Sequence, residues 1–330
     1  MAARFDDVPA LLRIEDYSRT TLFDLTPFRV KPLWLMPDGL VLCVDSLLLV
    51  ERLGPHVFWT MMNALDTPER RRRFAGTWGL AFESYCLDQL AQVFGAKSWA
   101  YLRNPKDTFT NEELSDAVAV RQTAAVLVEC KGTFMTSAEK YSGVPGRFMR
   151  GLTQKFGNVR HGGIYQLVRA ISHIWVEQLA PDSVPKSTST TDVFPILVVQ
   201  DPAVGCNVTA RVLSDRFDVA MKRASNDVKH KMPRIWPLTV VSIDELDRLA
   251  AAVKATGQPI DSVLKRFHRT HPSRMVSLGE FMSSAASADF SSAEKLKPIV
   301  QARFKATTEL ALQRFRDGDY GGAPQLDVAD

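Results

Sequence analysis

The sequence has few cysteines, and their spacing argues against disulfide bonds and against a structural zinc site. Its 330 residues contain four, Cys43, Cys86, Cys130 and Cys206, and no two of them form a C-x-x-C pair. A disulfide framework and a structural zinc site are therefore not expected. Three of the four lie among apolar neighbours, which favours small buried side chains without chemical roles.

Long apolar runs are also missing. No stretch of about 18 or more uncharged apolar residues occurs, so a membrane span is not expected. Residues 40–50 come nearest, but they are too short and include Asp45. The first residues lack the apolar segment of a secretory signal. We therefore expect a cytoplasmic protein that does not bind membranes.

Several common catalytic signatures are absent from the chain. We find no Walker A motif, no Rossmann glycine set, no zinc-finger spacing and no nucleophile elbow. An NTP-driven motor is therefore not expected in this chain.

The composition is that of a folded protein. Hydrophobic residues make up 45% and charged residues 24%, which argues against disorder. The length suggests roughly two domains, or one enlarged by insertions. The net charge of +4 and the pI near 8.8 permit binding to nucleic acid without requiring it.

Helical and strand patterns alternate along the chain and predict an α/β fold. Asp38-Gly39 between two apolar runs predicts a hairpin, and Thr67 followed by Pro68 predicts a helix that runs to about Phe94. Residues 132–163, rich in Gly, Ser and Lys, are expected to form a long irregular connection. The order of elements predicts a mixed β-sheet core flanked by helices. We divide the chain into an N-terminal β-containing accessory section (1–68), a core (69–204), and a C-terminal region (205–330) that is α/β and then mainly helical.

The strongest chemical signal lies at the end of an apolar strand over 124–131. Glu129 and Lys131 are two residues apart, so both side chains should point to one face of the sheet. If Gln122 and Thr123 close a hairpin, Asp116 comes directly opposite Glu129. Two facing carboxylates destabilise a sheet, whereas a hard divalent cation turns them into a binding site.

Ser115-Asp116 followed by Glu129-Cys130-Lys131 resembles the PD-(D/E)XK nuclease superfamily, which has the restriction-endonuclease-like fold. The resemblance covers roughly residues 72–200 and includes Glu83 in the first helix and Gln166 in the second. Ser115 stands where the motif name has proline. The resemblance says little about residues 1–68 or 250–330.

The resemblance implies a Mg²⁺-dependent nuclease, with Mn²⁺ able to substitute, that hydrolyses phosphodiester bonds by metal-activated water. Asp116, Glu129 and the Cys130 carbonyl would hold one ion, and Glu83 would bind it through water or help to hold a second. Lys131 would orient or deprotonate the attacking water, and Gln166 would position the water or the phosphate. DNA is the expected substrate ahead of RNA, and defence of a bacterium against foreign DNA is the expected role.

Basic side chains near these residues are candidates for contact with the phosphate backbone, because such contact is electrostatic. The candidates are Arg71, Arg72, Lys140, Arg147, Lys155 and Arg160. A solvated helix face would equally explain the arginines. A protein partner that gates activity, or a homodimer, is also expected from the same resemblance.

Three other interpretations stay open at this point. The chain could bind nucleic acid without turnover, or be gated by a partner. It could hydrolyse RNA or small phosphoesters instead of DNA. Finally, Glu129 and Lys131 could form a surface ion pair on an ordinary α/β domain, because E-x-K occurs on many solvated strands.

Overall fold

The computed structural model describes ten segments of the chain. They are residues 2–4, 28–29, 31–53, 56–95, 98–107, 110–140, 143–157, 162–176, 190–226 and 232–284. The candidate Arg160 lies outside these segments, as does the chain after residue 284. Within them, no helix combines the length and the apolar character needed to cross a membrane.

In the N-terminal section, the described residues include a small three-stranded sheet and the helices α3 and α4. Its elements are β1 (Ala2–Arg4), β2 (Leu33–Leu35), β3 (Val41–Cys43), α3 (Ser46–Leu53) and α4 (His56–Ala64). Strands β2 and β3 pair in antiparallel fashion, and Gly39 has a φ of 83° at the turn. The hairpin predicted at Asp38-Gly39 is therefore confirmed, because glycine adopts positive φ at little cost.

Helix α5 (Pro68–Phe94) spans 27 residues and begins as predicted. The Thr67 side chain accepts a hydrogen bond from the backbone N–H of Arg70 at 3.2 Å, which satisfies one of the unpaired donors of the first turn. Its second half packs on the central sheet through a set of buried residues, Phe82, Cys86, Leu87, Leu90, Val93 and Phe94.

The central sheet is mixed. Its strands are β4 (Ala100–Arg103), β5 (Ala117–Arg121), β6 (Ala124–Lys131), β7 (Asp192–Val199), β8 (Arg234–Ile235) and β9 (Thr239–Ser242). Strands β4, β5 and β6 are antiparallel neighbours, whereas β7 is parallel to β6 and to both β8 and β9. Arg121 pairs with Ala124, so the hairpin register predicted around Gln122 and Thr123 is confirmed.

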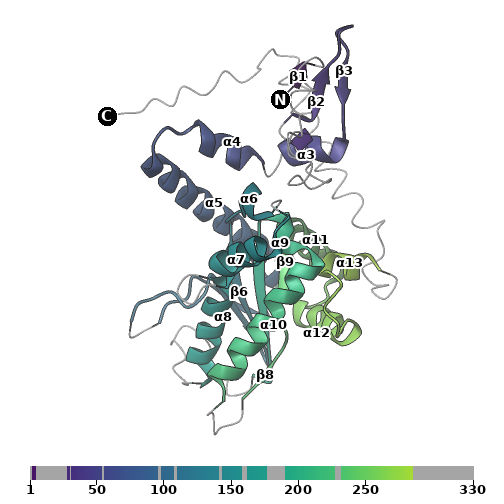
Figure 1. Ribbon diagram of the computed structural model, residues 1–330. Coiled ribbons are helices and arrows are strands. Elements are labelled where there is room, and N and C mark those ends of the chain that lie inside the picture. The colour runs from purple at the N-terminus through teal and green to yellow at the C-terminus, as the bar shows by residue number, and fades with distance from the viewer. Residues whose placement is uncertain are drawn as a thin grey trace.

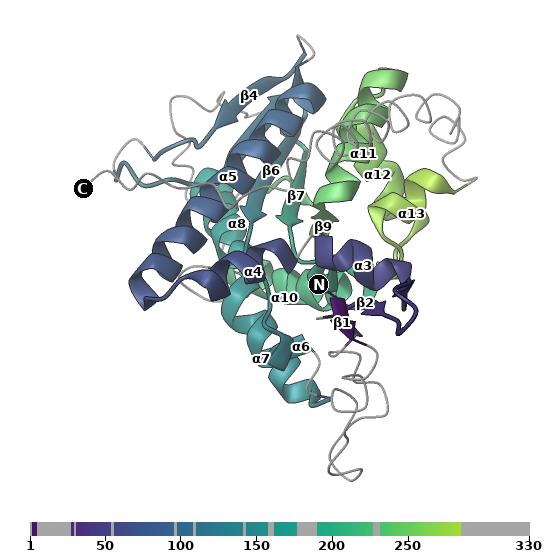
Figure 2. The same cartoon turned by 90° about the horizontal axis from the view of Figure 1, so that it is seen from above.

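Helices cover both faces of this sheet, as Figures 1 and 2 show. They are α6 (Ser137–Lys140), α7 (Pro145–Phe156), α8 (Gly163–Ile171), α9 (Pro202–Gly205), α10 (Asn207–Ala224), α11 (Ile243–Thr256), α12 (Ile260–Thr270) and α13 (Leu278–Ser283). A π-helical turn, Ser172–Val176, continues α8. The predicted α/β class, with a mixed sheet, an N-terminal hairpin and a helical C-terminal part, is confirmed. The division of the chain at residues 68 and 204 stays a prediction; β8 and β9 belong to the same sheet as β7.

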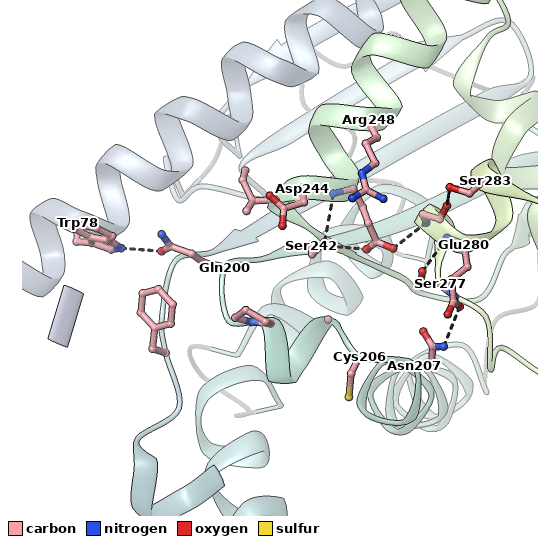
Figure 3. Close-up of a pocket in the computed structure, with 16 residues that line it drawn as sticks. Trp78, Gln200, Cys206, Asn207, Ser242, Asp244, Arg248, Ser277, Glu280 and Ser283 are labelled. Carbon is pink, nitrogen blue, oxygen red and sulfur yellow. Dashed lines mark hydrogen bonds between the residues drawn. The ribbon is translucent and has the colours of Figure 1, made fainter. Parts of the chain in front are cut away.

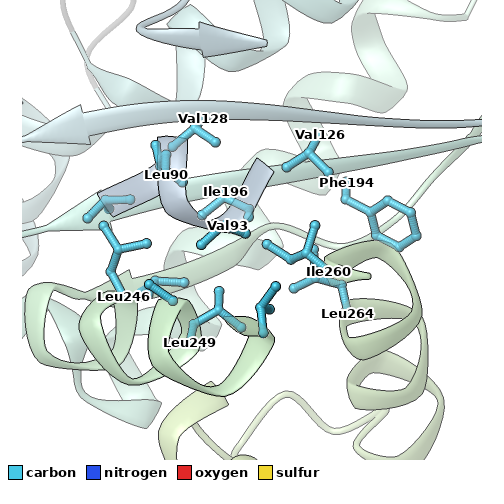
Figure 4. Close-up of a cluster of buried hydrophobic side chains, with 14 of the residues drawn as sticks. Leu90, Val93, Val126, Val128, Phe194, Ile196, Leu246, Leu249, Ile260 and Leu264 are labelled. Carbon is cyan, nitrogen blue, oxygen red and sulfur yellow. The ribbon is translucent and has the colours of Figure 1, made fainter. Parts of the chain in front are cut away.

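Two hydrophobic cores, one on each face, follow the alternation of the strands. On β6, Val126, Val128 and Cys130 face α5, α11 and α12 (Figure 4), whereas Ala125 and Leu127 face α7, α8 and α10. The alternation places the next two odd-numbered residues, Glu129 and Lys131, on the α8 side of the sheet.

The connection after β6 is more regular than the sequence led us to expect. Residues 145–156 form helix α7, so the prediction of an irregular segment over 132–163 was wrong there. Phe148, Met149, Leu152 and Phe156 recur at helical spacing and pack into the core below the sheet. The Gly, Ser and Lys content around them obscured this pattern, and burial of the apolar face stabilises the helix.

Gly163, the first residue of α8, allows this helix to lie directly against β6 and β7. A Cβ at this position would come within 2.5 Å of Leu197 Cδ1 and 3.3 Å of the Cγ atoms of Glu129 and Lys131. Leu197 is fully buried, so its side chain could move only by displacing other atoms of the packed core. The glycine therefore sets the distance between α8 and the polar end of β6.

We predict that Gly163→Ala destabilises the protein by about 1–3 kcal/mol, the usual cost of overpacking a core. Urea unfolding of the two proteins measures the difference. Gly146→Ala is the matched control, because a Cβ at Gly146 in α7 meets nothing within 4 Å and should leave stability unchanged or slightly raise it. Equal midpoints for Gly163→Ala and the parent protein would contradict the close approach.

Candidate metal site at the end of strand β6

Glu129 and Lys131 share one face of β6, as predicted, and form an ion pair. Lys131 Nζ lies 2.7 Å from Glu129 Oε1, and the side chains are 19% and 1% exposed. Burying a carboxylate is costly unless its charge is balanced. The pair is therefore not the exposed surface ion pair of an ordinary solvated strand.

Asp116 lies just before β5 and is held against β6. Its Oδ2 accepts a hydrogen bond of 2.6 Å from the backbone N–H of Cys130, and the residue is 5% exposed. The confirmed register of β5 and β6 continues by one residue to place Asp116 opposite Glu129. The Asp116 carboxylate is thus fixed next to the buried Glu129 carboxylate, at the open end of the β5–β6 hairpin.

Two further carboxylates reach Asp116 from other elements. Oxygen atoms of Glu83, from α5, and Glu113, from the loop before β5, lie within 4.8 Å of each other and of an Asp116 oxygen. Asn104 fixes this arrangement, since its Nδ2 donates to Glu83 Oε1 at 3.0 Å and its backbone N–H donates to the Asp116 carbonyl at 2.8 Å. Glu83, Glu113 and Asp116 form an acidic cluster that could hold a metal ion.

Buried polar atoms around the cluster have no hydrogen-bond partner among the described residues. They are Glu129 Oε2, Gln166 Oε1 and Asn104 Oδ1. Gln166 lies on α8 one turn after Gly163, on the helix face that packs against Glu129. Unsatisfied buried oxygen atoms are rare in folded proteins. Three of them here fit a site that a hydrated cation and a substrate would complete.

Burial raises the pKa values of both central carboxyl groups. The pKa of Asp116 rises to about 8, first through desolvation and then through repulsion by Glu129. Desolvation raises the pKa of Glu129 to about 7, and the positive charge of Lys131 opposes this shift. Burial therefore disfavours the ionised form of Asp116, and Lys131 offsets only part of the same cost for Glu129.

The donor set suits a hard divalent ion. Carboxylate oxygens are the ligands preferred by Mg²⁺ and Mn²⁺, and the cluster offers one oxygen from each of three side chains. Glu129 lies outside the group of oxygens that fall within 4.8 Å of one another. The predicted ligation by Glu129 and by the Cys130 carbonyl stays a prediction.

The basic candidates are distributed differently from the acidic ones. Arg72 and Arg147 are exposed on α5 and α7, and Arg71 Nε donates to the Leu65 carbonyl at 2.9 Å. Two lysines are engaged within the chain: Lys140 Nζ lies 3.2 Å from an Asp201 oxygen, and Lys155 Nζ lies 2.6 Å from Glu139 Oε2. Their contact with nucleic acid stays a prediction, and for both lysines it would require these ion pairs to open or to be shared.

Sequence reasoning overlooked Glu113 and Asn104. Glu113 enters the site because residues 104–116 turn back on themselves, with the Leu114 N–H donating to the Pro105 carbonyl at 2.9 Å. Asn104 has a φ of 45°, a conformation that asparagine tolerates better than most residues. An asparagine before proline and an acidic residue three positions before Asp116 were the available signals.

We predict that Asp116→Asn stabilises the metal-free protein increasingly as pH rises from 5 to about 8. The pKa of Asp116 is raised in the folded state, so the unfolded chain loses its proton first and wild-type stability falls with rising pH in this range. Thermal melts in EDTA at several pH values measure the difference. Asp88→Asn, at an exposed position of α5, is the control. A difference that is constant with pH would contradict the raised pKa.

Comparison with known proteins identifies no family. No family model matches the chain, and no curated protein matches it. Among solved structures, the chain has a distant similarity to the small subunit of the heterodimeric restriction endonuclease R.BspD6I. The TM-score is 0.28 and the identity 11%, over 74% of this chain and 96% of that subunit. These values are too low to support a conclusion about fold or function, so the site has to be interpreted from its own geometry.

Proposed function

We propose that this protein is a metal-dependent nuclease that hydrolyses phosphodiester bonds, with Mg²⁺ as the ion and DNA as the preferred substrate. The observation that carries the proposal is the convergence of Glu83, Glu113 and Asp116 beside the buried Glu129–Lys131 pair. Glu83 from α5 and Glu113 from the loop before β5 meet the buried Asp116 close to a second buried acid. Repulsion among these carboxylates is a cost that a bound cation would offset.

Each residue has a role that its position allows. Asp116, Glu83 and Glu113 would hold the ion, and Glu129 would join them or bind a water ligand. Lys131, whose ammonium lies on the same face, would orient the attacking water and balance charge that develops on the phosphate. Gln166, with its unsatisfied Oε1, would accept a hydrogen bond from that water. When bound, the ion supplies polarisation of the phosphoryl oxygen and a more acidic water.

DNA is proposed ahead of RNA because the motif resembles that of DNA-cleaving enzymes. Arg72 and Arg147 are exposed on α5 and α7, and they would contact phosphates of the substrate away from the cleaved bond. A protein partner or a second copy that controls activity remains part of the proposal, since an ungated nuclease would endanger its own cell.

We predict that the purified chain cleaves supercoiled plasmid with Mg²⁺ or Mn²⁺ and not with EDTA. Asp116→Ala and Lys131→Met should each lower the rate at least about 100-fold, because one removes an ion ligand and the other the cation beside the water. Gel analysis of nicked and linear products measures this. Lys254→Met, at an exposed position of α11, is the matched control and should cleave at the parent rate.

The outcomes of this assay separate the competing functions. Cleavage of structured RNA or of nucleotides but not of DNA would favour a phosphodiesterase of another substrate class. A folded wild-type chain that binds Mn²⁺ without cleaving any substrate would favour a gated enzyme or a binding protein. Activity that persists in EDTA or in Asp116→Ala would disprove the assignment of the site.

Glu113→Gln should weaken Mn²⁺ binding by about 10-fold or more, the usual effect of losing a group that coordinates or orients at a metal site. Isothermal titration calorimetry measures the affinity. Glu112→Gln is the matched control, since Glu112 is the neighbouring acid and pairs instead with Arg169. Equal affinity for the two variants would remove Glu113 from the site.

The same titration tests the ionisation of the site. Protons compete with the ion for carboxylates whose pKa values are raised to about 8 and about 7, so affinity should fall as pH decreases from 8 to 6. Metal binding should also release protons, and calorimetry in buffers of different ionisation enthalpy measures how many are released.

A further inference from the structure

A cavity of about 680 Å³ opens at the carboxyl ends of β7 and β9. Gln200, the residue after β7, and Ser242, the last residue of β9, line it together with Trp78 and Phe134 (Figure 3). In open α/β sheets, ligands bind preferentially outside the carboxyl ends of the strands. The position alone makes this cavity a candidate binding site that the metal site does not use.

The cavity lies next to the candidate metal site. The backbone N–H of Gln200 donates to the carbonyl of Lys131 at 3.3 Å, and Phe134 follows Lys131 by three residues. Trp78 precedes Glu83 on α5 by about 7.5 Å along the helix axis, at the usual rise per residue. These connections place the cavity and the metal site along the same edge of the sheet, so that one extended substrate could reach both.

One wall of the cavity is aromatic and fixed in place. Phe58 packs behind it, with its ring centroid 5.4 Å from that of Trp78 and 5.0 Å from that of Phe134. The indole Nε1 of Trp78 donates to Gln200 Oε1 at 2.7 Å. A preformed aromatic surface loses little entropy on binding, and it is the kind of surface on which single nucleobases stack.

The opposite wall is unsuited to a phosphate. Two of its backbone donors are already used, because Glu245 accepts hydrogen bonds from the N–H groups of Ser242 at 2.9 Å and Gly279 at 2.8 Å. Glu280 Oε2 likewise accepts from Asn207 Nδ2 at 2.9 Å. With these carboxylates in the wall, a second anion would be repelled. A neutral planar group is the better occupant.

Two side chains on α11 remain available at the rim. Asp244 and Arg248 lie one helical turn apart, both are exposed, and both line the cavity (Figure 3). The carboxylate accepts hydrogen bonds, whereas the guanidinium donates them. This pair is complementary to a base edge that presents an exocyclic amino group next to an acceptor, as in adenine or cytosine.

We infer that the cavity binds an unstacked adenine or cytosine base, contributed by a nucleotide on one side of the cleaved phosphate. Trp78 stacks on the base, and Asp244 accepts from its amino group. Enzymes that read a base in this way take it out of the stack into a pocket. The inference rests on the proposed function, which supplies the substrate class, and it adds a pocket that would select particular bases.

The test uses nucleosides as probes, titrated into the full chain in EDTA and followed by ligand-observed NMR. Adenosine, cytidine, uridine and their deoxy counterparts are compared. We expect saturable binding of adenosine and cytidine that is about 10-fold weaker in Trp78→Leu, the scale of one stacking contact. Trp78→Phe, which keeps an aromatic ring, should retain most of the affinity, and Trp34→Leu, in the N-terminal sheet, should retain all of it.

Asp244→Ala should weaken adenosine and cytidine binding and leave uridine unchanged. Uridine binding as tight as cytidine binding in the wild type would overturn the role of Asp244. No saturation by any nucleoside up to about 10 mM, roughly ten times the Kd of a weak 1 mM site, would overturn the base pocket. A preference between ribose and deoxyribose would tell whether the base comes from RNA or DNA.

The result is separable from that of the cleavage assay. Asp116→Asn should bind nucleosides like the wild type, because the measurement involves neither metal nor turnover. Nucleoside binding without any plasmid cleavage would support the base pocket, and it would mean that the protein is either not a nuclease or a nuclease that needs a partner. Cleavage without nucleoside binding would remove the pocket alone.

Discussion

The structure depends on one electrostatic constraint, the burial of Asp116 and Glu129 at the end of a hairpin. Desolvation raises the free energy of both ionised forms, and repulsion by Glu129 adds to this cost for Asp116. Lys131 offsets part of this cost through its ion pair with Glu129. The negative charge that Lys131 does not balance would be neutralised by a divalent cation.

The surrounding fold positions this centre with rigid elements. The β5–β6 hairpin sets the two acids opposite each other, and a Cys130 N–H holds Asp116. Helix α5 brings Glu83 from the opposite layer, and Gly163 lets α8 approach closely enough to bring Gln166. Catalytic geometry built on strands and helices is held more accurately than geometry built on loops. In this site, Glu113 is the member that depends on a loop.

The adjoining cavity extends the same edge of the sheet. Gln200 links the two features, since its backbone bonds to Lys131 and its side chain holds Trp78. Under the proposed function, an ion held by the acidic cluster would bind a phosphate and the cavity would bind a neutral base, so this edge would offer complementary surfaces for the two parts of one nucleotide. The chemistry and the choice of substrate would then be carried by neighbouring but separable groups.

Local sequence determined much of this architecture. Period-two alternation on 124–131 and the two-residue turn at Gln122 and Thr123 fixed which side chains face each other, because a strand has only two faces. Thr67 and Pro68 fixed the start of α5 because capping acts within one turn. These local rules were sufficient to bring Asp116, Glu129 and Lys131 together on one face.

Only the tertiary structure decided the remaining features. Glu113 joins the cluster because the 104–116 segment turns back, and Lys140 and Lys155 are ion-paired with acids distant in sequence. The cavity is likewise assembled from α5, the end of β7 and the start of α11. Such contacts depend on how whole elements pack, and propensities that act over a few residues contain no information about them.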